Sequence, residues 1–248
     1  MSCLRAALLL LLLLPSPGLA AGPEAITAVR PDGTLEGPDG GAMRLAHLRL
    51  PDRLGPAAAP LQEEAVALLR EICRRPAVRV VPLGVDRWRR PLVTIATAEG
   101  DAALALLARG LAVVEPRAHL EGDLAPLFAA EDVARRRKSG LWAAALHVHA
   151  ADGAVPVDGF GIVEGVVVSA ARVSGRIYVN FGADYKIDFT VVAEGDTLRA
   201  LQRGTPPATA LAGYRIRVRG MLEDWNGPLL RLPGPQAMEI LSAPLAAP

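Results

Sequence analysis

The chain has 248 residues, of which 51% are hydrophobic and only 4% aromatic, with 27 Lys and Arg against 26 Asp and Glu. This length allows one large domain or two small ones. The near-zero charge balance argues against a protein that holds nucleic acid mainly through bulk positive charge. The only cysteines are Cys3 and Cys73, which argues against a disulfide framework or a cysteine-rich zinc site.

The first twenty residues have the pattern of a secretory signal peptide. Arg5 precedes a leucine-rich run, and a Pro/Gly break leads to small residues that end at Ala20. The apolar run is too short to span a bilayer as a permanent anchor. We therefore expect cleavage after Ala20, a periplasmic or secreted location, and no stable membrane anchor. Cleavage leaves 26 basic and 26 acidic side chains, so the mature chain has a formal charge of zero.

Residues 21–145 mix strand-like and helix-like patterns. Runs rich in β-branched residues predict strands, and apolar residues three and four apart predict helices. Asp101 is a suitable N-cap for one short helix, and Gly110 follows its end. The predicted strands cover residues 26–35, 42–50, 78–83, 92–97 and 111–114, and the predicted helices cover residues 60–74, 102–108 and 124–138.

Residues 146–158 are small, polar and aperiodic, as expected of a linker. Residues 159–248 contain mostly strand-like runs, and Asn226-Gly227 between two of them predicts a hairpin. Five short strands and one helix predict a small β-barrel of the OB type. No internal repeat has a fixed period. The predicted strands cover residues 161–170, 176–181, 187–192, 214–222 and 229–232, and the helix covers residues 197–203.

Four strings in the first part, in the same order and at similar spacing, resemble motifs of the staphylococcal nuclease (thermonuclease) family. Residues 43–52 (MRLAHLRLPD) resemble that family's Arg-Leu-x-x-x-Asp-Thr/Ala-Pro-Glu strand end, and residues 86–92 (DRWRRPL) resemble its Asp-x-Tyr-Gly-Arg-x-Leu. Residues 107–112 (LARGLA) and 130–142 resemble its Leu-x-x-Gly-Leu-Ala and its closing helix. The resemblance implies an OB barrel with three helices over residues 24–145. The expected fold class of the whole chain is mostly β with α (α+β), with a second OB-like barrel after the linker.

The family hydrolyses phosphodiesters with one Ca²⁺, a carboxylate that acts on the attacking water, and two arginines that bind the phosphate. The resemblance places the phosphate arginines at Arg44 and Arg90 and the general base at Asp52, which is one methylene shorter than the family's glutamate. It places the two metal-binding aspartates at Gly33 and Arg49. The second of these is a reversal of charge.

The substitution at Arg49 opposes metal binding. A guanidinium repels a divalent cation, and each charge–charge interaction at first-shell distance amounts to several kcal/mol. A millimolar Ca²⁺ site is worth only about 4 kcal/mol. The family's threonine, which offers a backbone carbonyl to the metal, is replaced by Leu50. We therefore expect no bound cofactor unless Asp32 takes the place of Gly33, and we expect Arg49 to pair with Asp32 or Asp52.

Three functions are compatible with these observations, and the sequence favours the first. On this first hypothesis, the protein is a catalytically degenerate nuclease that acts by binding nucleic acid or another phosphate-bearing ligand, or by scaffolding. Alternatively, it is an active Ca²⁺-dependent phosphodiesterase on DNA or RNA that uses Arg44, Arg90 and Asp52 with Asp32 as a ligand. As a third alternative, both barrels are structural modules that bind envelope proteins.

Four residues in the second part resemble the stacking surface of an OB-type single-strand binder: Arg176, Tyr178, Phe181 and Tyr185. The alternative is a barrel core in which strand alternation puts Tyr178 and Phe181 on different faces. Basic and acidic residues are equal in number between residues 157 and 241, so no positive surface is expected there.

Three further residues are expected to be unremarkable. His147 and His149 alternate like metal ligands, but no third ligand is near them in the sequence, so they are expected to be solvated. Cys73 lies on the apolar stripe of its helix and is predicted to be a buried, inert thiol.

Overall fold

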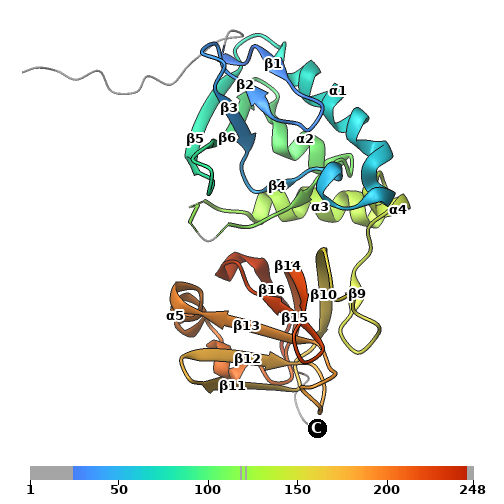
Figure 1. Cartoon of the computed structure of the whole chain (residues 1–248), viewed down its shortest axis with the longest axis vertical. Coiled ribbons are helices and arrows are strands. Elements are labelled where there is room, and N and C mark those ends of the chain that lie inside the picture. Colours follow the sequence, from blue (N-terminus) through green and yellow to red (C-terminus); the bar gives the residue numbers. More distant parts are fainter. Residues whose placement is uncertain (1–24, 118, 121, 245–248) are drawn as a thin grey trace, which may run out of the picture.

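The computed structural model describes residues 25–117, 119–120 and 122–244 (Figure 1). The predicted signal peptide, residues 1–20, lies outside the described residues. Among the described residues, no helix is long and apolar enough to cross a membrane. Two sheets, of six and eight strands, each enclose a separate hydrophobic cluster. The α+β class and the succession of two barrel-like units are as predicted.

The first sheet curls into a half-barrel with the strand order β1-β2-β3-β6-β5. Its strand β3 runs parallel to β6, with Arg44 opposite Leu92, and α1 connects β3 to β5 along the chain. A parallel pairing of the third and fifth strands with a helix before the fourth is the topology of an OB barrel. We call this unit the first barrel. Its strands are β1 (Ala28–Val29), β2 (Leu35–Glu36), β3 (Ala42–Leu45), β5 (Arg79–Val85), β6 (Pro91–Thr97) and β7 (Gly100–Asp101), with β4 (Leu48–Arg49) and β8 (Val113–Val114) as a separate pair.

The helices of the first barrel agree closely with the sequence patterns. The Asp101 carboxylate accepts a hydrogen bond from Ala103 N at 2.7 Å and so caps α2 as predicted. Leu69 and Ile72 of α1 are fully buried in the core of the first barrel. The helices are α1 (Gln62–Cys73), α2 (Ala102–Ala108), α3 (Ala125–Arg137) and α4 (Leu141–Ala144), with the 3₁₀ turns η2 (Pro51–Arg53) and η3 (Pro56–Leu61) before α1.

Two predicted strands of the first barrel are divided. The strand predicted over residues 26–35 is two short strands, β1 and β2, joined by a turn at residues 31–33. The strand predicted over residues 42–50 is interrupted at His47, whose φ is 55°. A left-handed residue ends a strand locally, and the chain beyond it pairs with β8 instead of β6.

The second sheet has the order β11-β12-β13-β15-β14-β10-β9, with β13 parallel to β15 and α5 after β13. β11 follows β10 after a bend at residues 167–168, so β10 and β11 together act as the first strand of this unit. Counted in this way, the strand order is the same as in the first barrel, and the pairing of β10 with β14 closes the sheet into a ring. We call this unit the second barrel. It contains β10 (Phe160–Val166), β11 (Ser169–Val173), β12 (Arg176–Asn180), β13 (Thr190–Glu194), α5 (Gly195–Arg203), η4 (Ala208–Ala210), β14 (Arg215–Asp224), β15 (Pro228–Arg231), η5 (Pro235–Ala237) and β16 (Met238–Ser242).

Two predicted segments near the second barrel differ in detail. The strand predicted over residues 187–192 begins only at Thr190, because residues 184–188 form a turn around Asp184. The segment predicted as a linker contains β9 (His149–Ala150), which pairs in parallel with β10. The chain between the barrels is therefore partly built into the second sheet.

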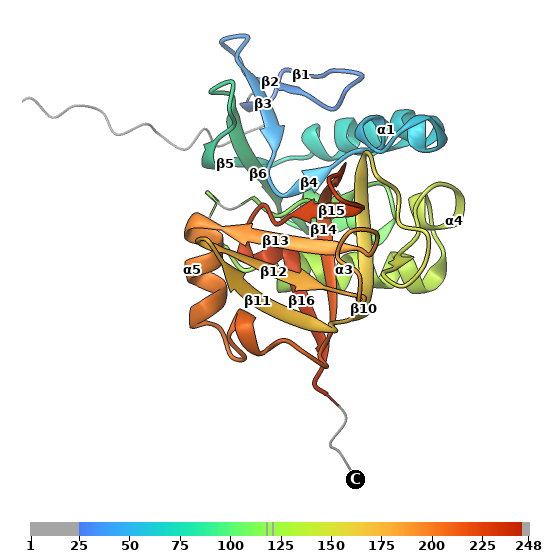
Figure 2. The same cartoon turned by 60° about the horizontal axis from the view of Figure 1, so that its bottom comes forward.

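The two barrels share a small apolar cluster and a buried ion network. Ile162 of β10 is fully buried in one cluster with Val113, Ala134 and Leu141 of the first barrel. Figures 1 and 2 show α3 on the side of the first barrel that faces β10 and β14. Arg219 of β14 reaches across this contact to Glu131 of α3, with Nη1 2.7 Å from Oε1.

Candidate functional site

The turn between β1 and β2 holds Asp32 in a fixed position. Its Oδ1 accepts a hydrogen bond from Thr34 N at 3.0 Å, and its Oδ2 accepts one from Thr34 Oγ1 at 2.8 Å. Arg44 Nη2 lies 3.4 Å from the same Oδ2. Burial raises the pKa of Asp32, but the bonds from Thr34 and the charge of Arg44 outweigh it and lower that pKa overall. This carboxylate is therefore already used by the turn and by Arg44.

Gly33, where the resemblance places a metal ligand, cannot readily be replaced by a larger residue. Its φ is 75°, and a Cβ at this position would lie 2.1 Å from Leu50 Cδ1. Leu50 is itself buried. Gly33 and Leu50, which both differ from the family pattern, are thus neighbours. The Leu50 methyl group occupies the space that a side chain at position 33 would need.

Arg49 does not form either of the ion pairs expected from the sequence. Its Nη2 pairs with Glu115 Oε1 at 2.5 Å, and its Nη1 donates to the Arg53 carbonyl at 2.9 Å. Among the described residues, Arg49 has no ion pair with Asp32 or Asp52. The reason is the antiparallel pairing of β4 with β8, which brings residue 115 next to Arg49 although 66 positions separate them in the chain.

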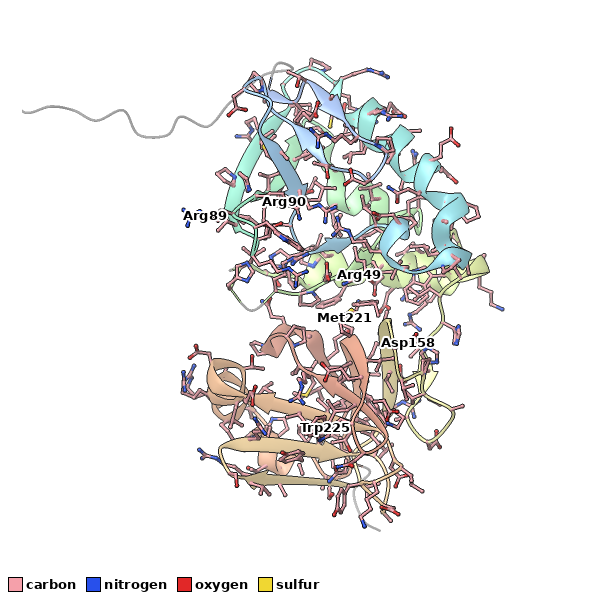
Figure 3. All side chains as sticks on the ribbon, in the orientation of Figure 1. Arg49, Arg89, Arg90, Asp158, Met221 and Trp225 are labelled. Atoms are coloured by element: carbon pink, nitrogen blue, oxygen red, sulfur yellow. The ribbon has the colours of Figure 1, made fainter. Side chains whose placement is uncertain are left out.

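The Arg49 side chain also points toward the second barrel (Figure 3). Its guanidinium carbon lies 4.7 Å from the centre of the Phe160 ring, and its Nη2 lies 3.7 Å from Met221 Sδ. A cavity of about 240 Å³ lies here between the barrels, lined by Arg49, Glu115, Phe160 and Met221 among others. The residue that reverses the charge of the metal position is therefore part of the contact between the barrels.

Asp52, the predicted general base, lies in η2. Gln62 connects it to the Asp32 turn, since Asp52 N donates to Gln62 Oε1 at 3.0 Å and Gln62 Nε2 donates to the Pro31 carbonyl at 2.8 Å. Burial raises the pKa of the Asp52 carboxyl, against the opposing charges of Arg53 and Arg44. Arg53 Nε lies 3.9 Å from Asp52 Oδ1.

The residues around this site do not fit a Ca²⁺ ion. Among the described residues, no group of three or more His, Cys, Asp or Glu side chains could hold a metal. Calcium takes six to eight oxygen ligands, usually with several carboxylates. Here Asp32 and Asp52 interact instead with the guanidinium groups of Arg44 and Arg53. No step of a reaction is therefore assigned to a metal at this position.

Arg90, the second predicted phosphate residue, is held by Asp86 in the turn between β5 and β6. Asp86 Oδ2 accepts a hydrogen bond from Arg90 Nε at 2.8 Å, and its Oδ1 accepts bonds from the backbone N of Trp88 and Arg90 at 2.9 and 3.0 Å. Although Asp86 is buried, these bonds lower its pKa. Because β3 and β6 are parallel neighbours, Arg44 lies opposite Leu92, two residues beyond Arg90.

The same turn carries an aromatic residue that the sequence interpretation missed. Trp88 is 60% exposed, and the guanidinium carbons of Arg87 and Arg90 lie 3.9 and 4.8 Å from its ring centre. Arg89, with φ of 64°, lies at the outer edge of the first barrel in Figure 3. Among the described residues, neither Arg87 nor Arg89 has an ion-pair partner. A tryptophan between three arginines, in the string DRWRR, is the signal that could have identified this surface.

Arg44 completes this part of the surface. Its Nε is buried and has no hydrogen-bond partner among the described residues. Removing a donor from water without a partner is costly. Because this Nε is buried, a phosphate oxygen reaches it only after the Arg44 side chain moves outward; guanidinium groups then commonly bind phosphates through two N–H groups.

The four residues predicted on the second barrel are divided between two environments. Tyr178 and Tyr185 line a groove of about 500 Å³ on the outer face of the sheet, together with Trp225. Phe181 is instead buried in the core, 5.2 Å from Phe189 between ring centres, so it offers no ring face to a ligand. Arg176 Nε is paired with Glu194 Oε2 at 2.6 Å. Strand alternation, the alternative interpretation of the sequence, separates Tyr178 from Phe181.

The remaining candidates have no metal-binding geometry. The His147 and His149 rings contact each other with centres 4.3 Å apart, and no metal group includes them among the described residues. Cys73 is buried, as predicted, and burial raises the pKa of its thiol to about 12. A thiol with this pKa is almost entirely protonated at neutral pH and is a poor nucleophile.

Comparison with known proteins agrees with the topology. No curated protein matches the chain. Residues 42–144 match the model of the family described as Staphylococcal nuclease homologue, from β3 to α4. The match includes Arg44, Asp52 and Arg90 but begins after the turn that holds Asp32. Residues 42–144, which make up most of the first barrel, therefore form a staphylococcal nuclease homologue domain.

Proposed function

We propose that this protein binds single-stranded nucleic acid, or another phosphate-bearing ligand, on the first barrel and does not hydrolyse it. The observation that carries this proposal is the exposed turn at Trp88, where an indole ring that is 60% exposed lies in contact with the guanidinium groups of Arg87 and Arg90. Proteins that bind single strands without sequence preference combine aromatic rings, on which bases stack, with cations that follow the backbone. Arg44 adds a further guanidinium group, paired with Asp32, on the neighbouring strand.

The absence of hydrolysis follows from the chemistry of the donor groups. Metal-assisted hydrolysis needs a cation that lowers the pKa of the attacking water and stabilises the charge at phosphorus. The position of that cation is flanked by the Leu50 methyl group and by Arg49, whose charge repels it. Asp52 remains as a carboxylate near Arg44 and Arg53, but a carboxylate alone does not supply the cation that this reaction needs. We further propose that the protein acts after export, with the signal segment removed.

The proposal is tested with the full mature chain and fluorescein-labelled oligo(dT), with Ca²⁺ and with a chelator. We expect binding in both conditions, intact oligonucleotide on a denaturing gel, and affinity that falls as salt rises, because each phosphate contact releases counterions. Trp88→Ala should weaken binding. Arg136→Ala is the matched control, since it removes an exposed arginine of α3 away from the turn.

Two results would contradict the proposal. Cleavage that the chelator abolishes, and that Arg90→Ala also abolishes, would show an active phosphodiesterase. A lack of binding even at low salt would remove the nucleic-acid function and favour a role as a scaffold for envelope proteins.

A further inference from the structure

Both barrels present an exposed tryptophan at the same topological position. Trp88 lies in the β5–β6 turn and Trp225 in the β14–β15 turn, and in each case the second strand of the hairpin pairs in parallel with the third strand of its barrel. Their exposed fractions are 60% and 64%. The neighbours differ, because Trp88 is surrounded by arginines whereas Trp225 is followed by Asn226 and Gly227.

The Trp225 turn forms one side of the groove of about 500 Å³ on the second barrel. Tyr178 of β12 and Tyr185 of the following loop also line the groove, so aromatic rings from three segments border one space. Figure 3 shows Trp225 on the second barrel, away from the labelled Arg49, Arg89 and Arg90 of the first. In an OB barrel, the face of the second and third strands and the turn between the fourth and fifth strands form the ligand surface for oligonucleotides and oligosaccharides.

Polar groups in this groove are fixed by hydrogen bonds to one another. Thr190 Oγ1 donates to Asn180 Oδ1 at 3.1 Å, and Asn180 Nδ2 donates to Ser169 Oγ at 3.1 Å. The orientation of the Asn180 amide is therefore set before a ligand binds. Asn226, which follows Trp225 in the chain, also lines the groove and supplies a second amide. Amides and hydroxyls can both donate and accept hydrogen bonds.

Charge distinguishes between the two ligand classes of this fold. Among the described residues, no charged side chain lines the groove. Two arginines on strands that contribute groove residues are paired with carboxylates, Arg176 with Glu194 and Arg231 with Glu223, whereas Arg172 of β11 lies between two groove residues in the chain but does not line the groove. Single-strand binders, in contrast, depend on a positively charged groove.

The segments that border the groove are acidic on balance. Residues 182–188 and the turn at residues 224–227 carry three carboxylates, Asp184, Asp188 and Asp224, against one cation, Lys186. This loop and this turn therefore oppose the approach of a polyanion, whereas a neutral ligand would meet no electrostatic penalty.

We propose that the groove of the second barrel binds a neutral oligosaccharide. The apolar faces of pyranose rings would stack on Trp225, Tyr178 and Tyr185, and the amides of Asn180 and Asn226 would bind sugar hydroxyls. Each contact needs only the uncharged groups that the groove contains. The inference rests on the second barrel alone and is independent of the function proposed for the first.

The experiment titrates the full mature chain, by isothermal calorimetry, with two probes: the hexamers of β-1,4-linked glucose and of β-1,4-linked N-acetylglucosamine. We expect at least one hexamer to bind with an affinity that does not change with salt concentration. Trp225→Ala should weaken this binding by about tenfold or more, because it removes a stacking ring. Trp88→Ala is the matched control, and it should leave the sugar affinity unchanged while it weakens oligo(dT) binding.

Three outcomes would overturn the inference. The first is that neither hexamer binds at millimolar concentration, while circular dichroism shows a folded chain. The second is hexamer binding that Trp225→Ala does not weaken. The third is binding of oligo(dT), or of a proline-rich peptide, that Trp225→Ala abolishes, since the groove would then serve another class of ligand.

Discussion

Arg219 offers the sharpest test of how the two barrels are held together. It is 1% exposed, and its Nη1 and Nη2 bind Glu131 Oε1 and Glu239 Oε1, each at 2.7 Å. Glu131 belongs to α3 of the first barrel, where its Oε2 accepts a hydrogen bond from Val114 N at 2.6 Å. The Arg219 guanidinium carbon also lies 4.6 Å from the centre of the Phe128 ring. One side chain thus connects both barrels.

Arg219→Ala should lower the free energy of unfolding by about 3–5 kcal/mol, the usual cost of removing one partner of a buried ion pair. The substitution leaves Glu131 buried with only the Val114 N–H group to stabilise its charge. Since a domain is stable by only about 5–15 kcal/mol, this loss is severe. The matched control is Arg231→Ala, which breaks an ion pair whose side chains are 40% and 44% exposed, and which should cost at most about 1 kcal/mol.

The loss should also depend on pH. Burial raises the pKa of Glu131, and the charge of Arg219 acts against this rise. Without Arg219, the pKa of Glu131 in the folded state rises further above its unfolded value. A raised carboxyl pKa means that the folded state binds more protons, so stability falls as pH increases through this range. Arg219→Ala should therefore be less destabilising at pH 5 than at pH 7.

Urea unfolding of both variants, followed by tryptophan fluorescence and by circular dichroism, measures these differences. Trp142 belongs to the apolar cluster shared by the two barrels and reports on this contact. A second variant, Glu131→Leu with Arg219→Met, replaces the pair by apolar groups and should recover part of the loss, because it removes the buried charge but also leaves Val114 N–H without its acceptor. A cost for Arg219→Ala below about 1 kcal/mol, equal to that of Arg231→Ala, would refute the reasoning.

Three further predictions concern the first barrel. Arg87→Ala should reduce the slope of log affinity against log salt for oligo(dT) by about 0.7, as expected for one lost phosphate contact, whereas Trp88→Ala should weaken binding without changing this slope; fluorescence anisotropy in a salt series measures both. Asp86→Asn should lower the melting temperature at pH 7, because the lowered pKa of Asp86 stabilises the folded state above about pH 4. The wild-type chain loses this stabilisation as the pH falls and Asp86 is protonated, so the difference in melting temperature between wild type and variant should shrink in thermal melts from pH 7 to pH 3. Cys73 should react with a thiol reagent only in denaturant, and rapid labelling of the native chain would contradict its burial.

Local patterns in the sequence were sufficient for most helices. The helix predicted over residues 102–108 has the observed bounds of α2, because an N-cap at Asp101 and a glycine at position 110 define it from both sides. The helix predicted over residues 124–138 is observed as α3 over Ala125–Arg137. These signals lie within a few residues of the element they define, so tertiary contacts are not needed to read them.

Features that depend on long-range pairing were not accessible in the same way. Arg49 was expected to pair with Asp32 or Asp52, but its partner Glu115 is brought close only by the β4–β8 pairing. The OB type of both barrels was predicted, from the family resemblance for the first and from the strand count for the second, although different apolar residues fill the two cores and no sequence repeat relates them. Trp225 was missed because a lone tryptophan in a hairpin turn has no motif around it, and only the fold places it beside Tyr178 and Tyr185.

The position of Arg49 links the charge reversal at the predicted metal position to the second barrel. Its guanidinium group is held by Glu115 within the first barrel and by contacts with Phe160 and Met221 of the second. A carboxylate at position 49 would lose the contact with the Phe160 ring and would face Glu115, which has the same charge. Replacing Arg49 by aspartate is therefore unfavourable both within the first barrel and at the contact with the second. The Leu50 methyl group next to Gly33 adds a second obstacle at the other ligand position. The charge of Arg49, the Leu50 methyl group beside Gly33 and the packing of the second barrel against Arg49 all oppose a cation at this position. We therefore expect that Arg49→Asp alone does not create a calcium-dependent nuclease.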